Sequence, residues 1–191
     1  MSLIKPHAYA ELPEVFYNLQ NWEGFKNPSL VIENAQLKKE MGLQNIEGYK
    51  LLEIFNGSSQ IKTLKPLSMV YAGHQFGQYV EQLGDGRGLL LGQINSSSGL
   101  IDIHLKGAGK TPYSRFGDGR AVLRSVIREY LCGEAMHALS IPTSRALMIV
   151  GSDELVIREK SETAAMLART AKSHIRFGNF VSTYSINQIQ T

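Results

Sequence analysis

Two copies of the tetrapeptide Gly-Asp-Gly-Arg occur in this chain, at Gly84–Arg87 and at Gly117–Arg120. Between them an alternating apolar and polar run ends at Lys106, and the second copy is followed by a segment of helical periodicity that carries Glu129. Glycine turns let backbone N–H groups approach an anion closely, and a lysine adds a compact positive charge. These residue types in this order predict a site that holds the phosphates of a nucleotide.

Each glycine turn also has a structural explanation. An Asp-Gly pair between apolar runs is typical of a β-hairpin, but a hairpin does not require the flanking Gly84, Arg87 and Gly88. The second copy leads into the predicted helix, and the N-terminus of a helix attracts anions. Asp118 could instead cap that helix, or contact a sugar, a base or a metal, so both explanations stay open.

The run from Ile101 to Lys106 predicts a half-buried strand, because its apolar and polar residues alternate. Asp102, His104 and Lys106 would share the polar face of this strand. A lysine on such a face is usually exposed to solvent, so a functional role for Lys106 depends on whether an acid lies near it.

The helical segment 121–139 offers two such acids. Glu129 lies at the border of its apolar stripe and Glu134 lies in the middle, and the stripe consists of Val122, Leu123, Val126, Ile127, Tyr130 and Leu131. An unpaired buried charge is costly, so an acid in such a place is expected to be paired or functional. A strand lysine paired with an acid on the next helix is the arrangement with which protein kinases hold ATP phosphates. Periodicity alone does not choose between Glu129 and Glu134.

Arg169 and Arg176 are seven residues apart near the end of the chain. Two solvated arginines are the common explanation for such a pair. The functional alternative is a guanidinium clamp on phosphate, for which the fork of N–H donors is suited.

The other elements indicate an α+β fold, with a small antiparallel sheet and one main helix on a face. Helices are predicted over 34–41 and 49–55, and further strands over 89–94, 145–150 and 155–158, the last two flanking a turn at Gly151–Glu154. Residues 1–60 are expected to form an N-terminal helical and loop extension, 61–180 the nucleotide-binding unit, and 181–191 an unrelated or disordered tail.

Composition excludes several classes of protein. The 191 residues are 43% hydrophobic and 19% charged with a net charge of +3, which is ordinary for a globular domain. Without a Lys/Arg run or a long apolar run, we expect no nucleic-acid partner and no membrane span. One cysteine and five scattered histidines predict neither a disulfide nor a zinc site. We expect a cytoplasmic protein, since no secretory signal precedes the first helix.

Five segments together resemble the selenoprotein O family, also called YdiU, over roughly residues 64–180. They are Tyr71–Gly77, Leu83–Arg87, Leu105–Gly109, Thr111–Ser125 and Ile175–Gly178. The resemblance implies a protein-kinase-like N-terminal lobe that binds ATP in a reversed orientation. AMP is then transferred to Ser, Thr or Tyr hydroxyls of proteins, and some members use UTP.

By resemblance, nucleotide contacts fall to Gly84, Gly86, Arg87, Lys106, Asp118, Gly119, Arg169 and Arg176. The family also selects Glu129 as the partner of Lys106. Its catalytic base and its ligands for Mg²⁺ or Mn²⁺ lie in a C-terminal lobe, so we expect them downstream of Thr191 and none within this chain. The expected function is protein nucleotidyl transfer that is incomplete in this chain alone. The alternative is a non-catalytic fragment that binds a nucleotide or a partner.

Overall fold

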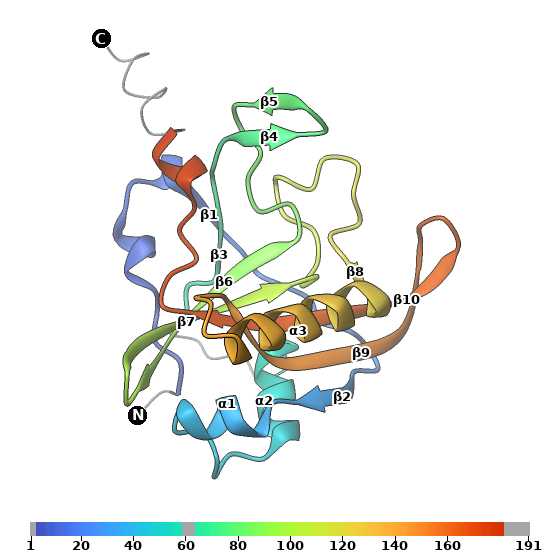
Figure 1. Ribbon diagram of the computed structural model, residues 1–191. Helices are drawn as coiled ribbons and strands as arrows, with labels where there is room; N and C mark the ends of the chain where they lie inside the picture. Colours follow the sequence, from blue (N-terminus) through green and yellow to red (C-terminus); the bar gives the residue numbers. More distant parts are fainter. Residues whose placement is uncertain (1–2, 59–63, 182–191) are drawn as a thin grey trace.

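The computed structural model describes residues 3–58 and 64–181, and within them one curved antiparallel sheet dominates (Figure 1). Its spatial order is β1-β3-β6-β7-β10-β9-β2, and β8 pairs with β10. The strands of this sheet are β1 (Tyr17–Leu19), β2 (Ser29–Glu33), β3 (Leu67–Met69), β6 (Gly88–Ser96), β7 (Gly99–Lys106), β8 (Ala121–Val122), β9 (Arg145–Ile157) and β10 (Ser161–Ala171). The α+β prediction with an antiparallel sheet is therefore confirmed.

Residues 177–181, after β10, are helical, and three other α-helices of the described residues pack around this sheet. They are α1 (Ala35–Glu40), α2 (Gly48–Phe55) and α3 (Leu123–Ala138), and short 3-10 turns cover Ala8–Glu11 and Glu14–Phe16. A separate hairpin of β4 (Gly73–Gln75) and β5 (Gln78–Val80) projects from the sheet (Figure 1). None of the helices in the described ranges is long and apolar enough to cross a lipid bilayer.

The residues before position 60 belong to the same sheet, since β1 and β2 are its two edge strands. Helices α1 and α2 end where they were predicted to end, at Gly42 and at Asn56-Gly57. Asn34 caps α1, because its side-chain oxygen accepts the Leu37 N–H at 2.9 Å. The expected boundary at residues 60 and 61, and the expected tail after Val181, lie outside the described residues.

Different helices pack on the two faces of the sheet. One face packs against α1 and α2 in the main hydrophobic core, to which β7 contributes Ile103 and Leu105. The other face packs against α3 through a smaller cluster that includes Val126, Ile149 and Leu167. Because neighbouring residues of a strand face opposite ways, Lys106 lies on the same face of β7 as His104, away from the main core.

Strand β7 is buried on both faces, although its sequence predicted a half-buried strand. Asp102 and His104 are 1% and 0% exposed. The Asp102 carboxylate accepts hydrogen bonds from His7, from Gln93 and from the backbone N–H of His174. The His104 and His174 rings lie 4.9 Å apart. The N-terminal segment and the segment after β10 therefore cover this face, which alternation within six residues cannot reveal.

The predicted turn at Gly151–Glu154 is wrong, because β9 continues through it and the chain reverses only after Ile157. Gly151 pairs with strands on both sides, opposite Ser29 and Ala165. Glu154 forms a two-point ion pair with Arg120. Residues typical of turns stay extended here because their backbone and side chains find partners across the sheet.

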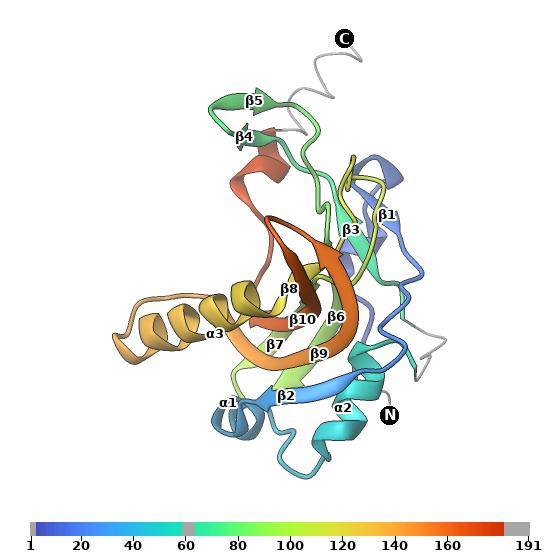
Figure 2. The ribbon, with the colours of Figure 1, turned by 90° about the vertical axis from the view of Figure 1, so that its right-hand side faces the viewer.

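Helix α3 begins two residues later than predicted, since Ala121 and Val122 pair with β10 as β8. Its predicted apolar stripe is only partly buried. Val126 is fully buried, whereas Ile127 and Leu131 are 38% and 62% exposed. Figure 2 shows why: α3 contacts β9 and β10 along one side and otherwise projects away from the sheet.

Candidate functional site

Lys106 and Glu129 form an ion pair that joins the end of β7 to α3. Their side chains are 22% and 28% exposed, so the pair is largely shielded from water. Burial lowers the pKa of the Lys106 ammonium, and Glu129 opposes this shift. Burial raises the pKa of Glu129, but the hydrogen bond from Lys106 and the nearby charges of Arg169 and Lys106 outweigh it and lower that pKa. The Glu129 carboxylate is therefore charged at neutral pH.

Arg169 is the third member of this cluster. It lies on β10 directly opposite His104 of β7, and its Nη1 lies 3.3 Å from Glu129 Oε1. Its Nη2 lies 2.8 Å from His104 Nδ1. The Glu129 carboxylate is thus held between an ammonium and a guanidinium, and the ammonium of Lys106 keeps N–H donors for another anion.

Glu134, the other candidate partner of Lys106, binds Arg145 instead. Two hydrogen bonds of 2.8 and 2.7 Å join the Arg145 guanidinium to both Glu134 oxygens. The pair connects α3 to the start of β9, so Glu134 serves the attachment of the helix to the sheet.

Glu134→Gln is expected to lower the free energy of unfolding by about 1–2 kcal/mol, because the largely buried Arg145 loses a charged partner. The matched control is Glu53→Gln, which removes the carboxylate of the exposed Lys50 ion pair on α2. That variant is expected to change stability by no measurable amount. Urea unfolding of both variants checks the prediction, and equal losses would contradict it.

The first glycine turn is tied into the protein by its own backbone. The N–H groups of Leu83 and Gly84 donate to the Tyr71 carbonyl, and those of Asp85 and Gly86 donate to Met69 and Gly84. Gly84 has φ of +62°, and a Cβ there would lie 2.3 Å from the Tyr113 ring. The turn is therefore not a simple hairpin, and its first amides are already occupied by carbonyl groups.

Arg87 ends this turn beside the lysine cluster, which consists of Lys106, Glu129 and Arg169. Its carbonyl accepts the N–H of Gly107 at 2.7 Å, and the next residue, Gly88, pairs with Lys106. The Arg87 side chain is exposed, and its positive charge lowers the pKa of Lys106. Two cations thus lie at the point where the turn meets the end of β7.

A cavity of about 580 Å³ contains five of the nine residues proposed from the sequence. They are Gly84, Gly86, Arg87, Asp118 and Gly119. The two glycine turns, far apart in sequence, thus line the same cavity. Three further arginines line it, Arg115, Arg120 and Arg158. The cavity is rich in guanidinium groups, which suits an anionic ligand.

The second glycine turn is built around Asp118 and Gly119. The Asp118 carboxylate binds the Arg158 guanidinium at 2.7 and 2.9 Å and accepts the Arg120 N–H at 2.9 Å. It does not cap α3, because β8 separates the turn from the helix. Gly119 has φ of +74°, and a Cβ there would lie 2.1 Å from the backbone of Gly109. The turn is held by close backbone contact.

Arg176 lies on the segment after β10 rather than on a helix with Arg169. Its guanidinium lies 5.0 Å from the centre of the Tyr71 ring, which lines the same cavity. Its charge lowers the pKa of Arg169, so the two groups are electrostatic neighbours. The structure therefore places Arg169 beside Glu129 and Arg176 beside Tyr71 of the cavity wall.

Sequence reasoning missed several residues of this region. Arg115 has φ of +53°, an unusual conformation for a side chain larger than glycine, and its guanidinium donates to Gln75 at 2.8 Å. Arg115 belongs to the long motif Thr111–Ser125, which was the available signal. Arg158 had no such signal, because it reaches the cavity from the far end of β9.

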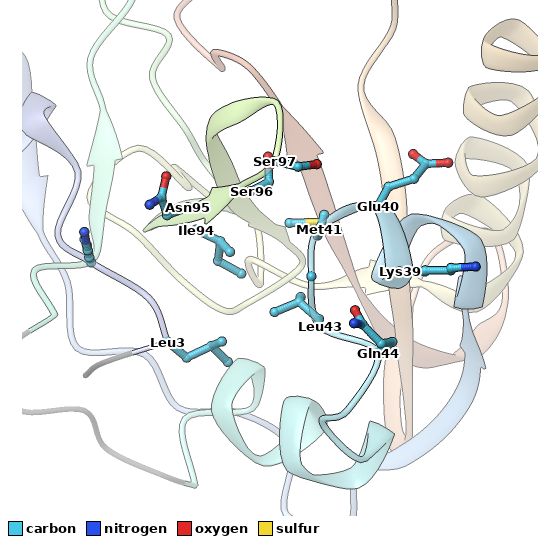
Figure 3. Close-up of a pocket in the computed structure, with 12 residues that line it drawn as sticks. Leu3, Lys39, Glu40, Met41, Leu43, Gln44, Ile94, Asn95, Ser96 and Ser97 are labelled. Carbon is cyan, nitrogen blue, oxygen red and sulfur yellow. The ribbon is translucent and has the colours of Figure 1, made fainter.

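Three other cavities among the described residues are lined by none of the predicted site residues. One of about 390 Å³ is lined by the end of α1, including Lys39 and Glu40, and by the tip of the β6–β7 hairpin, including Ser96 and Ser97 (Figure 3). No group of three or more His, Cys, Asp or Glu side chains in residues 3–58 and 64–181 is placed to hold a metal ion.

Comparison with known proteins identifies the family of this chain. A family model described as "Protein adenylyltransferase SelO" matches residues 2–191, a wider range than the five motifs cover. The chain is 52% identical over 184 residues to "Protein nucleotidyltransferase YdiU" of Vibrio parahaemolyticus, which covers 96% of this chain and 38% of that protein. It is 50% identical over 185 residues to the protein of the same name in Stutzerimonas stutzeri, covering 95% of this chain and 38% of that protein.

This chain thus spans less than half the length of these curated relatives. The family match and the relatives agree with the motifs that surround the lysine cluster and the cavity. The chain belongs to the SelO family of protein adenylyltransferases, also named YdiU protein nucleotidyltransferases.

Proposed function

We propose that this chain forms the nucleotide-binding lobe of a protein nucleotidyltransferase that transfers AMP from ATP, or UMP from UTP, to Ser, Thr or Tyr hydroxyls of proteins. The observation that carries the proposal is the Lys106–Glu129 ion pair, whose lysine pairs across the sheet with Gly88, the neighbour of Arg87 in the wall of a guanidinium-rich cavity. The pair supports a protein-kinase-like assignment, because the lysine ends the third strand of the β3-β6-β7 series and its partner lies on the next helix.

Within this proposal each residue binds or orients the nucleotide. Lys106 donates N–H groups to phosphate oxygens, and Glu129 keeps the ammonium in place while Arg169 keeps Glu129 in place. Arg87 adds charge at the turn, and Arg176 adds charge from the Tyr71 side. Gly84, Gly86, Asp118 and Gly119 shape the cavity walls.

The remaining parts of the reaction fall to residues beyond this chain. A divalent metal would neutralise charge on the phosphates, and its ligands and the catalytic base are proposed to lie downstream of Thr191. The described residues perform no step that involves the metal. The protein substrate and the cytoplasmic location are parts of the proposal that rest on the family.

The test compares residues 1–191 alone with the same residues joined to the C-terminal portion of the Vibrio parahaemolyticus relative. Both are given ATP labelled in the adenine or in the γ-phosphate, with Mg²⁺ or Mn²⁺. The joined protein is expected to place adenine label, and no γ-phosphate label, on protein. Transfer of γ-phosphate would contradict the proposal.

The second candidate function is binding without transfer, which the expected position of the base and metal ligands favours for this chain alone. In that case residues 1–191 bind ATP in a direct titration and leave no label on protein. Failure of residues 1–191 to bind ATP or UTP would contradict both candidates.

A further inference from the structure

A buried line of polar contacts leads from the first glycine turn to the lysine cluster. The Asp85 side chain points inward, is 3% exposed and accepts the Met69 N–H at 3.2 Å. Its Oδ2 lies 3.5 Å from Nε2 of the fully buried His104, which is an electrostatic contact, since Nε2 has no hydrogen-bond partner among the described residues. The other ring nitrogen, Nδ1, lies 2.8 Å from Arg169 Nη2. Asp85, His104 and Arg169 thus come from a turn and two neighbouring strands and meet in that order.

The chemistry of these groups determines where the proton of His104 lies. A guanidinium nitrogen only donates hydrogen bonds, so His104 Nδ1 must be the acceptor from Arg169. Burial and the positive charge of Arg169 lower the pKa of His104 to about 4, so its ring is neutral at pH 7. A neutral ring with a bare Nδ1 carries its proton on Nε2, which is the nitrogen that faces Asp85.

Asp85 is charged in spite of its burial. Burial raises the pKa of Asp85, but His104, the charge of Arg176 and the Met69 N–H outweigh this effect and lower that pKa. At this distance the negative charge of the carboxylate favours a ring nitrogen that carries the proton over one that presents its lone pair. The inward aspartate therefore selects the ring form that leaves Nδ1 free for Arg169.

We infer that Asp85 and His104 are positioning residues of the nucleotide site: Asp85 selects the His104 tautomer, His104 orients Arg169, and Arg169 holds Glu129 beside Lys106. This inference rests on the proposed function, because it treats Lys106 as the group that binds phosphate. It also gives the aspartate of the first Gly-Asp-Gly-Arg turn a task separate from that of its flanking glycines.

The first experiment measures the tautomer. Residues 1–191 are labelled with ¹⁵N at histidine, and the two ring nitrogens of His104 are assigned by NMR. Nε2 is expected to carry the proton in the unsubstituted chain. Asp85→Asn offers an amide N–H to Nε2, so the proton is expected to move to Nδ1, as the equivalent substitution does in the serine protease triad.

The control for this experiment is Asp102→Asn. It makes the same chemical change at the buried aspartate of β7, which contacts His7, Gln93 and the backbone of His174 rather than a ring nitrogen of His104. His104 is expected to keep its proton on Nε2 in this variant. A proton on Nδ1 in the unsubstituted chain would overturn the inference.

The second experiment uses two replacements of His104 and measures ATP affinity by titration. His104→Gln keeps an acceptor and an N–H donor, so it is expected to retain affinity within about twofold. His104→Met keeps the volume without either group and is expected to weaken affinity at least about fivefold, the effect of one lost hydrogen bond. If His104 only filled space, Met would bind ATP as well as Gln, and that result would overturn the inference.

The two experiments separate this inference from the proposed function. If residues 1–191 bind neither ATP nor UTP, the proposed function fails while the tautomer experiment still decides whether Asp85 controls His104. If ATP binds and Asp85→Asn changes neither the tautomer nor the affinity, the positioning inference fails alone. Thermal melting of each variant identifies a loss of affinity that arises from unfolding, and His104→Gln remains as the test if Asp85→Asn does not fold.

Discussion

Lys106→Ala is expected to weaken ATP binding by residues 1–191 at least about tenfold, which corresponds to ~1.4 kcal/mol. The reason is the loss of a charge-assisted hydrogen bond to phosphate in a place where the lysine side chain is 22% exposed and poorly screened by salt. Isothermal titration with ATP measures the effect directly. The fold is expected to survive, because Arg169 still neutralises the Glu129 carboxylate.

The matched control for this variant is Lys50→Ala. Lys50 is a surface lysine on α2, the helix that packs on the other face of the sheet, and it pairs with Glu53 at 3.1 Å. Its removal changes the net charge by the same amount and is expected to leave ATP affinity unchanged. Equal affinity of Lys106→Ala and the unsubstituted chain would remove the phosphate contact that the proposed function assigns to Lys106.

Gly119→Ala is expected to destabilise the protein by about 2–5 kcal/mol. A φ of +74° costs an L-residue about 1–2 kcal/mol, and overlap that forces the backbone to shift adds about 1–3 kcal/mol. The overlap is severe because the new Cβ would lie 2.1 Å from the Gly109 carbonyl carbon and oxygen. Urea unfolding measures the change, provided that the free energy of unfolding falls with urea concentration at the same slope in both proteins.

Gly77→Ala separates the two contributions. Gly77 has nearly the same φ, +79°, but nothing lies within 4 Å of the position of its Cβ. Only the conformational cost of about 1–2 kcal/mol is therefore expected there. If both variants lost the same stability, close contact between the second glycine turn and Gly109 would not be what requires glycine at position 119.

Much of the fold could be predicted because the signals are local. Asn34 and Gly42 bracket α1, and alternation from residue 101 to 106 marks β7, since a cap or a strand pattern is decided by residues a few positions apart. The turn at Gly151–Glu154 failed for the complementary reason. Its glycine and polar residues stay extended in β9 because of partners at Ser29 and Arg120, which are distant in sequence.

The amino-acid sequence by itself determined the membership of the family and a short list of chemical residues, among them Lys106, Glu129 and Glu134. Resemblance selected Glu129, and only the tertiary structure showed the physical reason. Helix α3 lies across β9 and β10 so that Glu129 reaches the end of β7 while Glu134 reaches Arg145. The partner of a charged group depends on which elements pack together, and helical periodicity contains no information about that.

The tertiary structure also decided what the twin Gly-Asp-Gly-Arg turns do. Both line one cavity, but Asp85 turns inward to His104 while Asp118 binds Arg158. Identical tetrapeptides acquire different contacts because β6 follows the first and β8 follows the second, and each strand directs its turn toward a different part of the sheet. Local sequence determines that a turn forms, and the long-range pairing of strands determines what its side chains meet.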